Sequence, residues 1–284
     1  MNWLYVILAV YIVAALLIAL ALLRKKRWPW VVVVLAAAFV LWKSLDLPRF
    51  LPPGSGGDVQ SEQAAFDVEV AHHPVLQVIR EQEPALFEQL RKRALVLEQE
   101  GRSGEQIVAA LQPQIAALQV KRLQSAPDAS VIRYMQANMQ QTVLMQKESD
   151  DACFRFLFPA VRGSVNAAEL LPEEVSAHRM QVDAEMMRAA VGPESHTMTD
   201  EERTQAQKDF LPVLQALVNE YGRDVELISK PQQAQNLQQE GKVCNIVQTL
   251  WRRVLALPAP KAASIIRLSV ALEEMNTPRR QVAP

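Results

Sequence analysis

Histidines are the first side chains in this sequence that could bind a metal or move a proton. His72 and His73 are adjacent, so on a helix or a strand they point in different directions and form a poor chelate. Pro74 follows them, which favours a loop just before a helix. His178 lies on an apolar helical stripe with Glu174 one turn earlier, which indicates a histidine at the edge of the core. The hydrolase patterns GxSxG, SxxK and HExxH are absent, so no catalytic site is expected.

The two cysteines are Cys153 and Cys244. An even pair in an oxidising compartment commonly forms a disulfide, and we predict this bridge on condition that the domain lies in such a compartment. Two buried free thiols are the alternative. As a nucleophile Cys153 would be poorly placed, because Asp150 and Asp151 precede it and their negative charge would raise the pKa of its thiol.

Acidic residues are grouped in two places that resemble cation sites. One group is Glu173, Glu174, Asp183 and Glu185, and the other is Asp200, Glu201 and Glu202. Acids at the start of a helix interact favourably with the helix dipole, and the remaining ones are expected to face solvent. EF-hand spacing is absent, so the sequence predicts no metal and no cofactor.

Methionines and alternating phenylalanines suggest a surface that binds a partner. Flexible thioethers concentrate at adaptable binding grooves, although core filling is their commoner role. The phenylalanines of CFRFLFP favour a short buried strand or an exposed docking edge, of which burial is the commoner. The candidate partner-binding residues are Met135, Met139, Met186, Met187, Phe154 and Phe156.

Helical periodicity dominates the sequence after residue 83. Capping signatures recur, with Ser103 followed by Gln106 and Thr199 followed by Glu202, and Asp128 is expected to be an N-cap. Gly101 is expected to end the helix over residues 83–100. Apolar stripes predict about seven amphipathic helices, which indicates an all-α soluble domain over residues 61–284. Only residues 153–157 and 224–228 could form brief strands.

Two apolar segments near the N-terminus predict a transmembrane hairpin, residues 1–47. Residues 3–23 contain no charge in 21 positions, which is enough to cross about 30 Å of hydrocarbon as a helix. Residues 28–47 are long enough if Lys43 extends toward the headgroups. Trp28, Trp30 and Trp42 suit an interfacial belt. A cleaved signal peptide is the alternative for the first segment, and a buried or interfacial helix for the second.

The hairpin's connector predicts its orientation. Arg24, Lys25, Lys26 and Arg27 form a short basic loop, and such loops stay in the cytoplasm. Residues 48–60 are rich in proline and glycine and indicate a linker. We therefore expect a protein of the bacterial inner membrane whose soluble domain lies in the periplasm.

The charge of residues 51–284 narrows the choice of partners. This part holds 24 basic and 30 acidic residues, a net charge of −6, without a basic cluster interleaved with aromatics. Nucleic acid is therefore not expected as a partner. The expected partners are the lipid bilayer and another envelope or exported protein.

Three function classes fit these features. The first is an interaction module such as an immunity or inhibitor protein that neutralises an exported toxin or enzyme. The second is a helical chaperone or assembly factor for an exported protein. The third is an envelope hydrolase without a recognisable motif. The absence of catalytic patterns makes an enzyme the least favoured of the three.

Overall fold

The computed structural model describes residues 66, 70 and 72–276, and all the regular elements in these residues are helical. The predicted membrane segments 3–23 and 28–47, the basic connector 24–27 and the linker 48–60 lie outside the described residues. Among the helices that are described, none combines the length and the hydropathy needed to cross a bilayer.

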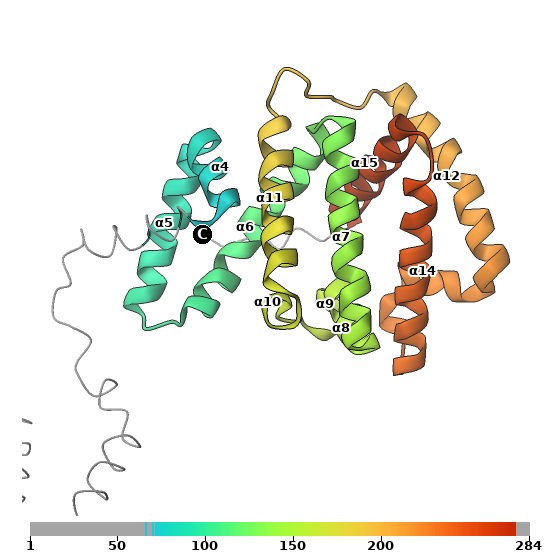
Figure 1. The fold of residues 1–284 in the computed structure, drawn as a ribbon, viewed down its shortest axis with the longest axis horizontal. Helices are drawn as coiled ribbons and strands as arrows, with labels where there is room; N and C mark the ends of the chain where they lie inside the picture. The colour runs from blue at the N-terminus through green and yellow to red at the C-terminus, as the bar shows by residue number, and fades with distance from the viewer. Residues whose placement is uncertain (1–65, 67–69, 71, 277–284) are drawn as a thin grey trace, which may run out of the picture. The chain divides into compact units, whose positions relative to one another are not determined.

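Most helices follow one another with short connections, and a longer loop over residues 190–199 joins α11 to α12 (Figure 1). They are α4 (Pro74–Gln82), α5 (Pro84–Gln99), α6 (Gly104–Ser125), α7 (Asp128–Glu148), α8 (Asp150–Leu157), α9 (Pro159–Arg162), α10 (Ala167–Leu170), α11 (Glu173–Ala189), α12 (Asp200–Tyr221), the 3-10 turn η2 (Gly222–Val225), α13 (Glu226–Ser229), the 3-10 turn η3 (Pro231–Gln233), α14 (Leu237–Leu255) and α15 (Ala259–Asn276). The all-α prediction is therefore confirmed for the described part of the chain.

Side-chain caps explain where the long helices begin. Ser103 Oγ accepts a hydrogen bond from the Gln106 backbone N–H, and the Gln106 side chain accepts one from the Ser103 N–H, which confirms the predicted capping box. Thr199 and Glu202 make the same reciprocal pair at the start of α12. Gly101 follows α5 with a φ of 76°, a conformation that favours glycine.

Three local predictions differ from the structure. Residues 153–157 are not a strand, because Ser149 caps a helix there by accepting a hydrogen bond from the Ala152 N–H at 2.9 Å. Residues 224–228 are not a strand either, since they span the end of η2 and the start of α13. Asp128 is the first residue of α7, after Pro127 at the N-cap, so its carboxylate lies in the first turn.

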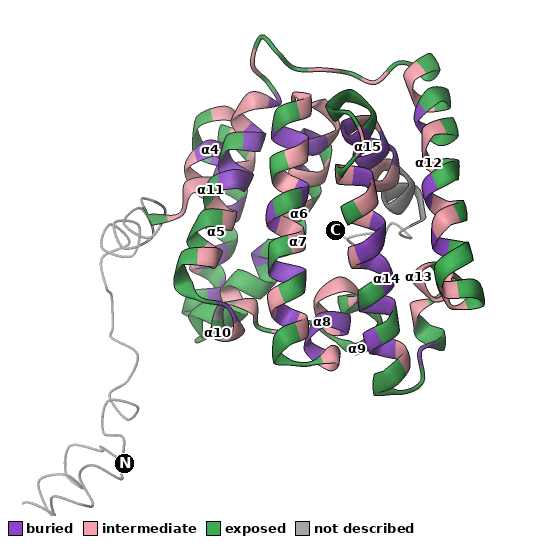
Figure 2. Ribbon diagram, turned by 45° about the vertical axis from the view of Figure 1, so that its right-hand side comes forward, coloured by how far each residue is buried: buried purple, intermediate pink, exposed green. Residues whose placement is uncertain are grey.

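Helix α7 is the centre of the helical domain. It packs against α11 on one side, against α14 on another, and against α8 and α15 as well (Figures 1 and 2). Its sequence explains this position, because buried residues such as Val131, Met135 and Met145 recur along it at helical spacing. A helix with partners on several sides is left with only a narrow exposed face.

The core consists of two clusters of buried side chains. The larger one is built from α4 to α7, α11, α12, α14 and α15, and it includes Leu90, Met186 and Ile265. The smaller one joins α8 to α14 and includes Phe154 and Cys244. In Figure 2 the buried residues lie on the sides of the helices that face one another. The exposed residues of α7, such as Gln136 and Val143, lie outside this packing and beside α14.

Candidate functional site

A groove of about 260 Å³ lies between α7 and α14. Its lining comprises Gln136, Met139 and Val143 from α7, and Gln248, Arg252 and Leu255 from α14. Met139 and Leu255 are half-buried and rest on the larger core cluster, whereas Val143 is 37% exposed. The groove therefore has an apolar floor with amides and one guanidinium around it.

Helical spacing explains how α14 presents this lining. Ile246, Leu250 and Val254 recur every four residues and are buried. Gln248 and Arg252 follow the same spacing on a different face, so burial of the first row leaves Gln248 half-buried and Arg252 exposed beside the groove. The buried apolar stripe of α14 thus positions the polar edge of the groove.

Gln146 connects the groove to the disulfide region. Its carboxamide N–H group donates to Asp150 Oδ1 at 2.9 Å, to the Gly241 carbonyl at 3.3 Å and to Asn245 Oδ1 at 3.1 Å. Its carbonyl oxygen accepts a hydrogen bond from Gln248 Nε2 at 2.5 Å. One side chain on α7 thereby ties together α8, α14 and the groove residue Gln248.

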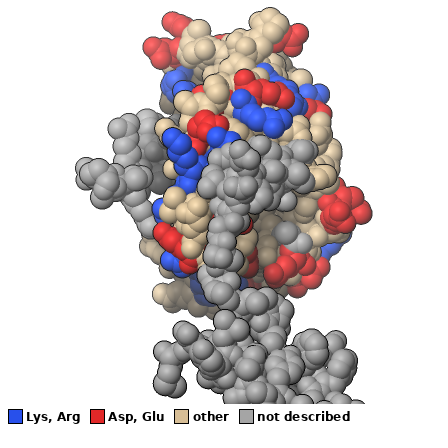
Figure 3. Space-filling model, turned by 90° about the vertical axis from the view of Figure 1, so that its left-hand side faces the viewer, with Lys and Arg blue, Asp and Glu red and all other residues tan. Residues whose placement is uncertain are grey.

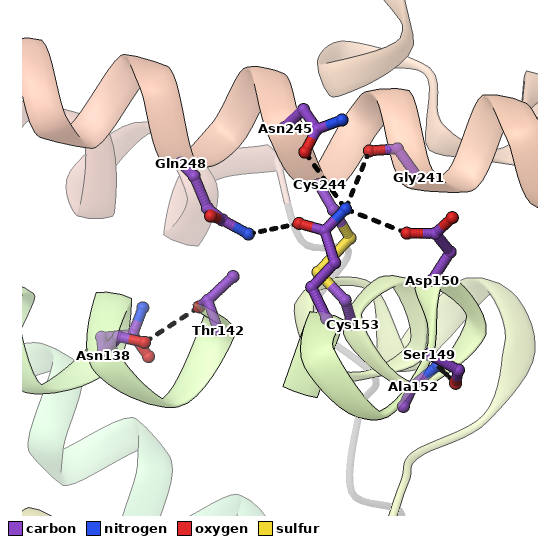
Figure 4. The surroundings of a disulfide bond; sticks show 11 residues. Asn138, Thr142, Ser149, Asp150, Ala152, Cys153, Gly241, Cys244, Asn245 and Gln248 are labelled. Atoms are coloured by element: carbon purple, nitrogen blue, oxygen red, sulfur yellow. Dashed lines mark hydrogen bonds between the residues drawn. A yellow bond between two sulfur atoms is a disulfide. The ribbon is translucent and has the colours of Figure 1, made fainter. Parts of the chain in front are cut away.

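The disulfide lies one helical turn from this amide network. Cys153 on α8 and Cys244 on α14 are bridged, with their Cα atoms 6.3 Å apart, and both are fully buried. Figure 4 shows the bridge beneath Gly241 and Asn245 of α14. The predicted pairing is confirmed, and the bridge leaves Cys153 without a thiol that could act as a nucleophile.

The predicted partner-binding residues occupy different environments. Met135, Met186, Met187 and Phe154 are at most 4% exposed, so they fill the core. Phe156 is half-buried against the smaller cluster. Of these six candidate residues, Met139 is the one that lines the groove.

Histidines contribute no binding site in the described residues. A loop over both histidines was expected, but His72 is helical and exposed, so the loop prediction holds only for His73, the N-cap residue of α4. His178 is exposed, so the prediction of a histidine at the core edge is wrong, although Val182, one turn later on α11, is buried. No group of three or more His, Cys, Asp or Glu side chains that could hold a metal occurs in the described part of the chain.

A buried polar cluster lies on the opposite side of α7 from the groove. Arg179 Nε donates to Asp183 Oδ1 at 2.8 Å, and Arg179 Nη1 donates to Asn138 at 3.0 Å. The guanidinium also lies 4.4 Å from the centre of the Tyr134 ring. Burial raises the pKa of the Asp183 carboxyl more than Arg179 lowers it. We assign this cluster to packing between α7 and α11, because its hydrogen bond to Asn138 and its ring contact with Tyr134 join these two helices.

Charges of both signs alternate on the face formed by α4 and α5 (Figure 3). Arg91 pairs with Glu88 at 2.7 Å, and Arg188 of α11 pairs with Glu81 at 3.4 Å. Interspersed signs leave little net field on this face.

Sequence reasoning missed the groove's polar residues. Gln136, Gln248 and Arg252 belong to no motif, and amides are common on helix surfaces, so no local signal singled them out. The one available signal was that Gln248 and Arg252 lie one turn apart beside the buried stripe of the same helix. Whether such a pair faces solvent or lines a groove depends on which helix packs beside it.

No known protein family, no curated protein and no solved structure matches this chain.

Proposed function

We propose that this chain is a membrane-anchored periplasmic module that binds one other envelope or exported protein through the α7–α14 groove. The observation that carries the proposal is the groove itself, in which half-buried Met139 and exposed Val143 lie beside amides and Arg252. An apolar floor with a polar rim between two helices suits a helix or an extended segment of another protein.

The chemistry of the groove favours binding over catalysis. No lining residue is a cysteine, a histidine, a serine or an acid, so the groove contains neither a nucleophile nor a general base. Its volume of about 260 Å³ is also below the roughly 300–1,000 Å³ typical of sites that enclose a small substrate. The proposed function is therefore interaction with a protein.

The size of the apolar floor favours one specific partner. A chaperone that holds unfolded chains needs a broad adaptable apolar surface, and Met135, Met186 and Met187 are buried in the core instead. Three apolar side chains form the floor of the groove. We therefore rank an immunity or inhibitor role above a general chaperone role.

Membrane attachment is supported by the hydropathy of residues 3–23 and 28–47 and by the basic connector between them. Alkaline phosphatase fused after Phe50 should be active, and a cytoplasmic reporter fused there should be inactive. The reverse pattern would place the domain on the cytoplasmic side.

Position-specific crosslinking in living cells tests the proposed groove. A photo-crosslinking amino acid at Gln136, on the rim of the groove, should give one discrete adduct in the full-length protein. The matched control carries the same amino acid at Leu211 of α12, which is 62% exposed, and should not give that adduct. Val143→Asn should reduce the adduct formed at Gln136. Equal adducts at both positions, or no adduct at Gln136, would contradict the proposal.

A further inference from the structure

The cations around the groove lack ion partners. Arg252 lines the groove, is exposed and makes no hydrogen bond or ion pair within the described residues. Lys147 lies one turn after Val143 on α7, and Arg133 lies one turn before Gln136, so both extend the same face. These two cations are also exposed and unpaired among the described residues.

Cations elsewhere on α14 are neutralised. Arg253, the next residue after Arg252, is 2.5 Å from Glu220 of α12, and Lys242 is 2.8 Å from Asp224. None of the six residues that line the groove is acidic. The chain therefore supplies carboxylates to the α12 side of α14 and leaves the groove side positive.

We infer that the α7–α14 groove takes an acidic amphipathic helix of the partner protein, with apolar side chains on Met139 and Val143 and carboxylates near Arg252. The inference rests on the proposed function, because it names the class of segment that occupies the same groove. Unpaired cations beside a desolvated apolar floor are complementary to carboxylates beside an apolar stripe.

The dimensions of the groove suit a helix. Gln136 and Val143 are seven residues apart on one helix, which corresponds to about 10 Å. Two turns of a partner helix span the same length and present apolar side chains at i, i+3 or i+4, and i+7. A helix can thus cover the groove with two or three anchoring side chains.

The local charge is opposite in sign to that of the domain. Residues 51–284 carry a net charge of −6, which repels an acidic protein as a whole at long range. The preference set by Arg252 therefore concerns the docking segment, and the rest of the partner need not be acidic.

Designed peptides test this charge preference on the full-length protein in nanodiscs of zwitterionic lipid. Three fluorescent helices of about 18 residues, roughly five turns, share one leucine stripe and differ only in flanking residues, which are Glu, Lys or Gln. Fluorescence anisotropy gives the Kd of each, and empty nanodiscs correct for binding to lipid. The Glu peptide should bind most tightly and the Lys peptide most weakly.

Charge reversal at one residue then locates the effect. Arg252→Glu should weaken binding of the Glu peptide roughly three- to tenfold, since it removes an attraction and adds a repulsion. The same variant should strengthen binding of the Lys peptide. Lys208→Glu, the same reversal at an exposed and unpaired cation on α12, is the matched control and should change neither Kd.

Substitution in the apolar floor separates the inference from the proposed function. Val143→Asn should raise the Kd of whichever peptide binds. Val218→Asn, on the exposed face of α12, should leave that Kd unchanged. If the Lys or Gln peptide binds as tightly as the Glu peptide and responds to Val143→Asn, the groove remains an interaction site and the acidic preference is wrong. If the Glu peptide does not bind, the inference is overturned. A missing adduct at Gln136 in the crosslinking experiment would overturn the proposed function as well.

Discussion

Gly241 of α14 lies directly against the carboxylate of Asp150 on α8. A Cβ atom at position 241 would be 2.5 Å from the Asp150 Cγ and 2.8 Å from its Oδ1, far inside van der Waals contact. The carboxylate is held in place because its Oδ1 accepts a hydrogen bond from Gln146 at 2.9 Å. The absence of a side chain at Gly241 therefore lets α8 and α14 approach closely beside the disulfide.

Gly241→Ala tests this close approach. Alanine favours a helix over glycine by about 1 kcal/mol, but here the new Cβ must displace a hydrogen-bonded carboxylate, and overpacking costs about 1–3 kcal/mol. The net change should be destabilising by about 1 kcal/mol, measured by thermal unfolding of the full-length protein with circular dichroism. In an Asp150→Ala background the same substitution should stabilise the protein.

Gly104→Ala is the control for this substitution, because nothing lies within 4 Å of a Cβ at that helical position. It should not destabilise the protein. If Gly241→Ala stabilises the protein while Asp150 is present, α8 can shift away from α14 at little cost, and the close approach does not require glycine.

The disulfide should contribute a large share of the stability. The bridge joins residues 91 positions apart, and removal of a link that closes a long loop costs about 2–4 kcal/mol. Cys153→Ala combined with Cys244→Ala should lower the midpoint of thermal unfolding accordingly. Both sulfurs are buried, so a reductant without denaturant should leave the native protein oxidised. Equal unfolding midpoints for the wild type and the double variant would show that the disulfide does not stabilise the protein.

The guanidinium of Arg162 forms an ion pair with the buried carboxylate of Glu240. The Glu240 side chain is fully buried, and Arg162 Nη2 lies 2.6 Å from its Oε1. Arg162→Met should destabilise the protein by about 2 kcal/mol, which is less than the roughly 3–5 kcal/mol expected for a fully buried pair, because Arg162 is 40% exposed. Thermal unfolding measures the loss.

Glu240→Gln combined with Arg162→Met should recover most of that stability, since the neutral amide needs no counter-charge. Arg93→Met on α5, at an exposed and unpaired arginine, is the matched control and should have little effect. A loss that persists in the double variant would indicate that packing by the Arg162 side chain, and not its charge, stabilises this region.

Local signals in the sequence predicted the helices well. The capping boxes at Ser103 and Thr199 and the glycine at position 101 each depend on residues close together in sequence, so their geometry could be foreseen. The disulfide was predicted from an even cysteine count on condition of an oxidising compartment. The error at residues 153–157 arose because aromatic alternation also fits a short helix whose Phe154 side faces the core.

The groove could not be predicted in the same way. It requires α7 and α14 to lie side by side, and their pairing depends on tertiary packing of residues about a hundred positions apart. The polar link from Gln146 to Gln248 depends on the same pairing. A polar residue in a helix normally indicates exposure to solvent, so the hydrogen bonds of these half-buried glutamines could not be predicted before α14 was placed beside α7.

The buried pair of Arg179 and Asp183 predicts an unusual dependence of stability on pH. Burial raises the pKa of the Asp183 carboxyl above its value in the unfolded chain, which is about 3.9. The folded protein therefore takes up this proton first as the pH falls, so the contribution of Asp183 to stability is fully present below the unfolded pKa. It is lost as the pH rises through the folded pKa.

Removing the arginine should enlarge this effect. Arg179→Met leaves a buried carboxylate that can escape its charge only by taking up a proton, so the variant should lose about 3 kcal/mol at neutral pH and less in acid. Arg179→Met combined with Asp183→Leu removes both charges and should recover that stability and abolish this component of the pH dependence. Thermal unfolding from pH 4 to pH 8 compares the three proteins. If the single variant loses equal stability at every pH, the loss comes from the contact of Arg179 with Tyr134 and Asn138, and the charge of Asp183 does not determine it.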